Sequence, residues 1–204
     1  YKDTGKVLPE TLREVENMER LVKEILTISK IEMDGLAGKA EPVPLPDTLA
    51  KVTETLLPLA QERQITIHSQ LVEDVTVSGN ASLLEKAIHN ILSNAIRHSP
   101  DGADVFIHLT PSILTVTNTG ASIPEEDLPV LFTPFYRVEK SRNKSTGGSG
   151  LGLYLVKTIL ELHGFRYRVE NTETGVVFTV AFRYNSGNVK IKTVRQVFPY
   201  CPKN

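Results

Sequence analysis

The sequence lacks the features that mark membrane-spanning, disulfide-rich and strongly basic proteins. No stretch approaches the roughly 18 consecutive apolar residues of a transmembrane helix, and the N-terminal "YKDTGKVLPE" has no apolar signal core. Cys201 is the single cysteine, which excludes an intramolecular disulfide or a cysteine metal cluster and is typical of a reducing compartment. Charge of one sign is also missing, since 23 Lys and Arg face 24 Asp and Glu. The net charge of -1 argues against a general nucleic-acid or membrane-surface binder.

What is present is the composition of a globular protein, with 40% hydrophobic and 23% charged residues among 204. This length suits one domain and a smaller element. We predict a helical region over 1–40, a main domain over 41–184 and a tail of no clear pattern over 185–204. Because the chain begins with Tyr and not Met, we interpret it as a fragment that could follow an upstream membrane anchor.

Residues 8–33 are predicted to form one long helix, with Pro9 in its first turn. Val15, Met18, Val22 and Ile25 step by 3, 4 and 3 positions, which is the spacing of a coiled-coil seam. Two interpretations are open. The helix could pack on its own domain, or it could be half of a helical hairpin or dimer bundle. The seam is widened by four further apolar residues, Leu12, Leu21, Leu26 and Ile28.

In the rest of the chain the predicted strands are grouped mostly apart from three predicted helices, which favours an α+β two-layer fold. Ser82 and Glu85 have the spacing of a capping box, and Gly164 is placed to cap the last helix at its C-terminus. The segment 34–47 is predicted to be a linker or an edge-like extended segment. The predicted helices cover 48–63, 83–98 and 151–163, and the predicted strands are "ITIHSQL", "VTVSGN", "DVFIHL", "ILTVTNTG", "RYRVENT" and "VVFTVAF".

The helix over 83–98 carries an unusual polar stripe. Asn90, Asn94 and Arg97 fall opposite its apolar face, although Asn is a poor helix former. A solvated polar face is one explanation. The other is a site, because amide oxygens can bind Mg²⁺ that bridges to phosphate, and an Arg one turn further can meet phosphate directly.

Two further segments favour a site. Asn118 places a polar group at the end of an apolar strand, just before a turn glycine. The run "GGSGLGL" over 147–153 offers backbone N–H groups at a helix N-terminus, where the helix dipole favours anions. Together these segments suggest metal ligands, a residue that recognises a nucleotide base, and backbone N–H groups that bind phosphate.

Five segments in order resemble the sequence boxes of bacterial sensor histidine kinases. The segments are "HNILSNAIRHS", "NTGASIP", "LFTPFYR", "GGSGLGLYLVKTILELHGF" and "TGVVFTV", which resemble the N, G1, F, G2 and G3 boxes. In addition, "RLVKEILTISKIE" is similar to the second helix of that family's dimerisation and phosphoacceptor hairpin. The resemblance covers nearly the whole chain except the tail.

The resemblance implies a Bergerat-type ATP-binding fold, an α+β two-layer sandwich with a mixed sheet, preceded by a dimerising helix. It implies transfer of the γ-phosphoryl of ATP to a hairpin histidine, then to an aspartate of a response regulator. Partners would be ATP, Mg²⁺, a response regulator and a second copy in the full-length protein, which would be the cytoplasmic portion of a membrane-anchored bacterial protein. Nucleic acid is not expected, because a lid over phosphates explains Arg137, Lys140, Arg142 and Lys144 better.

Site residues follow from the resemblance by position. Asn94 would be the principal Mg²⁺ ligand with Asn90 assisting, and Arg97 and Arg137 would reach the phosphates. Where ATP-hydrolysing relatives have a glutamate base, Asn90 is an amide, which favours a kinase. His98 would replace a common Tyr. The remaining nucleotide-binding positions would be Asn118, Gly120, Ile123, Phe132, Arg142, Gly148, Gly150, Leu151, Gly152 and Leu153.

Two departures from the family pattern stand out. The G1 box usually reads Asp-x-Gly-x-Gly, but here Asn118 replaces the Asp and Ser122 replaces the second Gly. We expect Asn118 still to read adenine, since its amide can both accept and donate. The phosphoacceptor motif is also absent, because none of the five histidines is followed by Glu. We therefore predict that this chain binds Mg-ATP without phosphorylating itself, and that the acceptor helix lies upstream of Tyr1.

Other functions stay open as alternatives. A serine kinase of the anti-sigma-factor type shares the Bergerat core but normally lacks a helix like 8–33. A non-catalytic nucleotide-binding or dimerisation module is a second alternative. A Rossmann dinucleotide motif is excluded because Leu153 stands where its third glycine belongs and no strand leads into the glycines. A Walker A motif is excluded because no Gly-Lys-Ser/Thr occurs.

Overall fold

The computed structural model describes residues 4–35, 40–138 and 149–182. Its helices are α1 (Thr4–Asp34), α2 (Leu45–Glu62), α3 (Ala81–His98) and α4 (Gly152–Leu162), with a short 3₁₀ turn at Leu128–Val130. Its strands are β1 (Glu41–Pro44), β2 (Thr66–Leu71), β3 (Thr76–Gly79), β4 (Asp104–Leu109), β5 (Ile113–Thr119), β6 (Arg166–Asn171) and β7 (Gly175–Ala181). The predicted tail over 185–204 lies outside the described residues, and the predicted domain boundaries stay a prediction.

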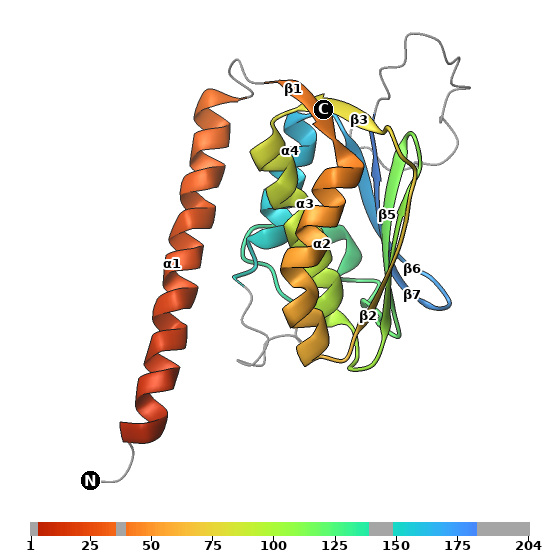
Figure 1. The fold of residues 1–204 in the computed structure, drawn as a ribbon. Coiled ribbons are helices and arrows are strands. Elements are labelled where there is room, and N and C mark those ends of the chain that lie inside the picture. The colour runs from red at the N-terminus through yellow and green to blue at the C-terminus, as the bar shows by residue number, and fades with distance from the viewer. Residues whose placement is uncertain (1–3, 36–39, 139–148, 183–204) are drawn as a thin grey trace.

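A five-stranded sheet forms one layer and three helices form the other. The strand order is β2-β4-β5-β7-β6, and α2, α3 and α4 cover one face of this sheet (Figure 1). The sheet is mixed, because β2 pairs with β4 in parallel and the other neighbours are antiparallel. On β4, Val105 and Ile107 are buried while Phe106 and His108 are exposed, as expected for a sheet covered on one face. The predicted α+β two-layer fold is confirmed.

A second, two-stranded sheet joins the ends of two segments that are far apart in the sequence. β1 pairs with β3 in antiparallel register, with Val43 opposite Val77, and both side chains are buried. The prolines at 42 and 44 fit an edge strand, where a missing N–H costs little. Of the two interpretations of 34–47, the edge-like extended segment therefore holds for residues 41–44.

The long helix α1 packs on the domain near its C-terminus and leaves an apolar face exposed. Near its C-terminus, Ile28 and Ile31 are buried in the common core, and α1 contacts α4 there. The four predicted seam residues are exposed. Packing on its own domain therefore holds for the C-terminal part of the helix, while half of a hairpin or dimer bundle stays a prediction. The exposed large apolar residues of α1 in the described part of the chain are Leu12, Val15, Met18, Val22, Ile25, Leu26 and Met33.

The helix starts differ from expectation in three places. α2 begins at Leu45, three residues before the predicted 48. α1 begins at Thr4, so Pro9 lies beyond the first turn. At α3, the predicted capping box of Ser82 and Glu85 is wrong. The cap is Asn80, whose side-chain oxygen accepts from the backbone N–H of Leu83 at 3.1 Å, which satisfies a donor that the helix start leaves unpaired.

At the C-terminus of α4, Gly164 has φ +68, which confirms the predicted glycine cap. Among the described residues, none of the helices is both long enough and apolar enough to cross a membrane.

Candidate nucleotide site

Two adjoining cavities lie between the helix layer, the sheet and α1. One, of about 350 Å³, is mostly apolar. The other, of about 550 Å³, is lined mainly by polar and charged residues. They are continuous, because both are lined by Asn94, Arg97, His98, Leu131, Val138 and Leu153. The shape suits a ligand with a flat apolar end and a charged end.

The apolar cavity contains one buried polar group. Asn118, at the end of β5, is only 6% exposed, yet it lines this cavity. No hydrogen bond of its side chain is found in the described part of the chain, so its amide is available to a ligand or water in the cavity. Its burial follows from the β5 pattern, in which alternate residues are buried. The apolar walls come from α3 and the sheet, through Ile91, Ala95, Val116, Val169, Val176 and Phe178.

The polar stripe of α3 faces the second cavity. Asn90, Asn94 and Arg97 are half-buried and line it, which favours a site over a solvated polar face. The amide nitrogen of Asn90 donates to the carbonyl of Lys86 at 3.0 Å. Its oxygen, Oδ1, is therefore turned toward the first residue of α4, Gly152.

Two glycines at the start of α4 allow close approach of the backbone. A Cβ on Gly152 would lie 3.0 Å from Asn90 Oδ1. Gly150 has φ +75, and a Cβ there would lie 2.7 Å from the backbone of Phe135, whose N–H donates to the Gly150 carbonyl at 3.0 Å. Gly150 is thus needed for close packing against Phe135, in addition to lining the polar cavity.

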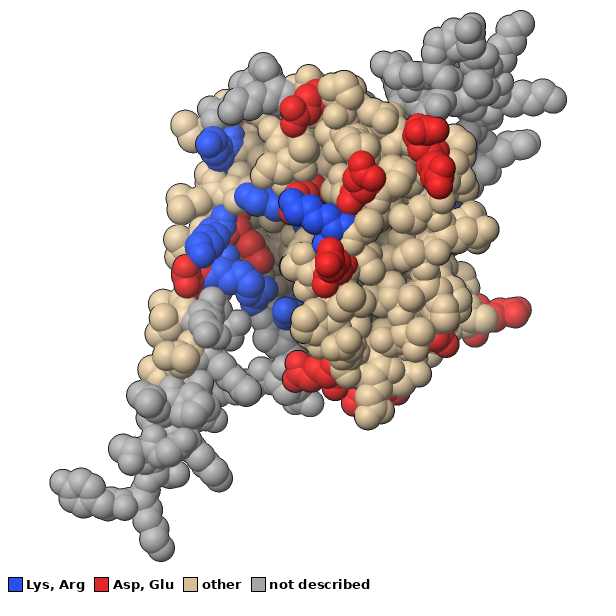
Figure 2. Space-filling view, viewed as in Figure 1, with Lys and Arg blue, Asp and Glu red and all other residues tan. Residues whose placement is uncertain are grey.

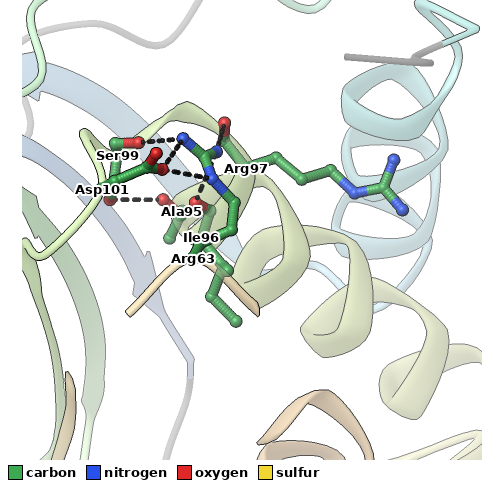
Figure 3. A network of polar contacts seen from close by, with 6 residues as sticks. All are labelled: Arg63, Ala95, Ile96, Arg97, Ser99 and Asp101. Carbon is green, nitrogen blue, oxygen red and sulfur yellow. Dashed lines mark hydrogen bonds and ion pairs between the residues drawn. The ribbon is translucent and has the colours of Figure 1, made fainter. Parts of the chain in front are cut away.

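An arginine from α2's end fixes the end of α3 that carries the site. Arg63 donates to the carbonyls of Arg97 and Ser99, two groups that α3 leaves unpaired (Figure 3). Its Nε and Nη2 also both donate to Oδ1 of Asp101, at 2.8 and 2.7 Å. The Arg97 side chain runs away from this network (Figure 3). Arg63 therefore binds the backbone carbonyl of Arg97, while the guanidinium of Arg97 points away from Arg63 (Figure 3).

Positive charge gathers around the polar cavity. Figure 2 shows basic side chains around a hollow beside α1. Burial, and then the charge of Arg20, lower the pKa of Arg97, whose buried Nε has no hydrogen-bond partner among the described residues. Desolvation by surrounding protein atoms, and then three nearby arginines, lower the pKa of His98. The His98 ring still reaches solvent, because it lines both cavities.

The residues present fit a hard divalent cation that also binds phosphate. Side-chain amide oxygens suit Mg²⁺, which keeps several waters and bridges to phosphate oxygens. Asn90 and Asn94 supply such oxygens on one face of α3, next to the orphaned Nε of Arg97. Within the described ranges, no group of three or more His, Cys, Asp or Glu side chains could hold a metal ion.

Most predicted site residues come together, and a few do not. Ile123 lines the apolar cavity, Arg137, Gly150 and Gly152 line the polar one, and Leu153 lines both. Three others line neither cavity. They are Gly120 in a turn beside Pro100, Phe132 packed on Tyr167 and Phe178, and Leu151 buried before α4.

Arg142 and Gly148 lie outside the described residues. The sequence reasoning missed the side chains that α1 brings to the polar cavity, Arg20, Lys23 and Glu24 among them. No local pattern marks these residues, because they come from a helix whose contact with α4 is set by tertiary packing.

Comparison with known proteins points to one family. Residues 79–186, just over half of the chain, match the family model described as histidine kinase-, DNA gyrase B-, and HSP90-like ATPase. The chain is 31% identical over 182 residues to sensor protein VanSB of Enterococcus faecalis, and 33% identical over 186 residues to sensor histidine kinase CusS of Escherichia coli O157:H7.

These alignments cover 87% and 88% of this chain but only 41% and 38% of the two relatives. The chain thus spans about two fifths of their length. Among solved structures, the histidine kinase AdeS of Acinetobacter baumannii superposes with a TM-score of 0.72 and 23% identity, covering 91% of this chain and 88% of that one. At this identity the superposition shows the fold alone.

Proposed function

Because the chain belongs to the family of histidine kinase-, DNA gyrase B- and HSP90-like ATPases, we propose that it is the ATP-binding catalytic region of a sensor histidine kinase. The family resemblance expected from the five sequence boxes is confirmed. In the proposed reaction the region transfers the γ-phosphoryl of ATP to a histidine on a hairpin helix, for relay to a response regulator. Dimerisation through α1 and membrane attachment through other segments are part of this proposal.

The observation that carries the proposal is the buried amide of Asn118 in an apolar cavity. It is 6% exposed, lines this cavity and makes no side-chain hydrogen bond with the described residues, so its amide is available to a ligand that both accepts and donates hydrogen bonds. The amino group and ring nitrogen of adenine form such an edge. The aliphatic and aromatic walls around Asn118 suit the faces of a purine ring.

The charged end of a nucleotide would then lie along α3. Asn94 and Asn90 would hold Mg²⁺, and Arg97, His98 and Arg137 would face the phosphates. When bound, the cation neutralises charge on the phosphate oxygens. Phosphoryl transfer needs mainly positioning and charge neutralisation. An amide at Asn90 cannot take a proton from water near neutral pH, which limits wasteful hydrolysis and suits a kinase.

Titration calorimetry tests the proposal. We expect the chain to bind ATP in the presence of Mg²⁺ and to bind more weakly with EDTA. Asn94→Ala should reduce the Mg²⁺-dependent affinity by about tenfold, which corresponds to about 1.4 kcal/mol. Gln70→Ala, on the exposed surface of β2, is the control and should bind as the wild type does. Absence of ATP binding by the folded wild-type chain would contradict the proposal.

Radiolabel transfer tests the reaction class. With labelled ATP we expect no acid-labile label on this chain alone, because none of its histidines has the acceptor context. Addition of a phosphoacceptor hairpin from a sensor kinase should give acid-labile label on the hairpin. Tight ATP binding without any transfer would favour a non-catalytic nucleotide-binding module. Label on this chain alone would overturn the predicted absence of an acceptor.

A further inference from the structure

Helix α1 supplies one wall of the polar cavity. Arg20, Lys23, Glu24 and Thr27 of α1 line the same cavity as Asn90 of α3 and the glycines before α4. The cavity is therefore composite, and the domain alone would form only part of it. This arrangement places side chains of the long helix where the charged end of a nucleotide is proposed to lie.

The position of Arg20 is set by a chain of contacts that ends at the start of α4. Arg20 Nη1 lies 3.5 Å from Glu24 Oε1, and the Glu24 side chain is only 11% exposed. The other oxygen of Glu24, Oε2, accepts from the Ser149 hydroxyl at 2.6 Å. That hydroxyl in turn accepts from the backbone N–H of Leu151 at 3.1 Å. Glu24 thus couples Arg20 to the segment that begins α4.

The charge around this cavity is unbalanced. The described residues that line it include five Lys and Arg side chains and one carboxylate, that of Glu24, although Lys23 is also paired with Glu19 at 2.6 Å. The whole chain has a net charge of only -1, so this excess is local. The five basic residues are Arg20, Lys23, Lys86, Arg97 and Arg137.

Two of these charges are close enough to affect each other. Burial is the largest cause that lowers the pKa of Arg97, and the positive charge of Arg20 is the second largest. Like charges gathered in a partly enclosed space repel, and a polyanion between them relieves the repulsion.

Resting on the proposed function, we infer that Arg20 is a polyphosphate-binding residue that α1 contributes to the nucleotide site, with Glu24 orienting it. The nucleoside triphosphate then bridges α1 and the domain. By linkage, nucleotide binding favours the docked position of α1, and docking of α1 raises nucleotide affinity by the same factor. With adenine in the neighbouring cavity, only the outer phosphates of a nucleotide would reach Arg20. The ligand class is therefore a nucleotide with at least two phosphates.

Arg20 could instead serve only to neutralise Glu24, and calorimetry on the full chain separates the two roles. Arg20→Ala should weaken Mg-ATP binding by at least about threefold and leave AMP binding unchanged, because AMP lacks the outer phosphates. In Arg20→Ala/Glu24→Gln the carboxylate is also removed. If Arg20 contacts phosphate, the double variant stays weaker than the wild type. Lys30→Ala, on the same helix but outside the cavity, is the matched control.

Each outcome decides a different point. Absence of Mg-ATP binding by the wild-type chain contradicts the proposed function itself. Wild-type binding with an unchanged affinity in Arg20→Ala overturns only the role of Arg20. Wild-type affinity restored in the double variant shows that Arg20 acts through Glu24 alone, which also overturns the inference. An equal loss for AMP and ATP overturns it too, since AMP binding reports the folded adenine site.

Discussion

The side-chain oxygen Oδ1 of Asn90 lies so close to Gly152 that a Cβ added to this glycine would approach it to 3.0 Å. The two residues come from α3 and α4, and 61 positions in the sequence separate them. The contact brings a predicted metal ligand against the glycine-rich helix start. It makes the geometry of Asn90 sensitive to a single methyl group on the neighbouring helix.

Gly152→Ala should therefore weaken the site without unfolding the protein. The added methyl displaces the Asn90 oxygen, so we expect Mg-ATP affinity to fall about threefold to tenfold. The free energy of unfolding should change by less than about 1 kcal/mol, because Ala suits a helix better than Gly does. Calorimetry and urea unfolding measure the two effects. Ser82→Ala, exposed on α3, should change neither, and an unchanged affinity in Gly152→Ala would show that Asn90 tolerates displacement.

Asn118→Ala tests the base-reading end of the site. Loss of the buried amide should weaken ATP and AMP by the same factor, about tenfold, because both carry adenine. Asn118→Asp should keep most of the affinity, since a carboxylate still accepts from the adenine amino group. Calorimetry with both nucleotides provides the measurement. If Asn118→Ala binds ATP as the wild type does, Asn118 does not read adenine.

Arg63 should stabilise the fold far more than its ion pair with Asp101 alone suggests. Arg63→Ala leaves the carbonyls at the end of α3 unpaired, and we expect a loss of about 2 kcal/mol in the free energy of unfolding. Asp101→Asn should cost less than about 1 kcal/mol, because this carboxylate is 72% exposed. Urea unfolding compares the two variants. Equal losses would mean that the ion pair, and not the carbonyl contacts, provides the stabilisation.

His163 should make stability fall in mild acid. Its Nε2 accepts from the backbone N–H of Asn80 at 3.0 Å, its Nδ1 lies 2.6 Å from the carbonyl of Ile159, and burial lowers its pKa. Above the unfolded-state pKa of about 6.5 the ring is neutral in both states and the contribution is complete. As pH falls below that value, the unfolded state binds the proton first and stability is lost.

Urea unfolding between pH 8 and pH 5 checks this dependence against His163→Gln, which cannot titrate. The variant should be less stable at pH 8, but it should lose less stability than the wild type on acidification. The comparison of slopes is needed because the pKa values of His89 and His98 are also lowered by burial. Parallel slopes in the two proteins would contradict the role of His163.

The local part of the fold was predictable because it depends on patterns within short segments. Alternating apolar residues predicted β4 over 104–109, and its bounds agree with the structure. The polar stripe of α3 also followed from helical periodicity, which is why Asn90 and Asn94 were found. The cap of α3 was misplaced because Asn80 and Ser82 are both good capping residues, and only the chain path selects between them.

What could not be predicted depends on how distant segments meet. Pairing of β1 with β3 is set by packing between segments more than 30 positions apart, which no local pattern specifies. Arg20 was missed for the same reason, since the sequence pattern of its helix indicates only a coiled-coil seam flanked by polar residues. Gly150 was correctly placed near the site, but its close contact with Phe135 depends on tertiary structure.

The exposed apolar face of α1 should cause self-association. Met18 and Val22 are 65% and 54% exposed, and they belong to a seam with coiled-coil spacing. We expect sedimentation to show a mass that rises with protein concentration in the wild type. Val22→Glu should shift association to higher concentration by about tenfold or more, because it places a charge in the seam. Lys30→Gln changes the net charge equally outside the four-residue seam and should associate as the wild type does. A wild-type chain that stays monomeric at all concentrations would mean that this face has no partner in a second copy.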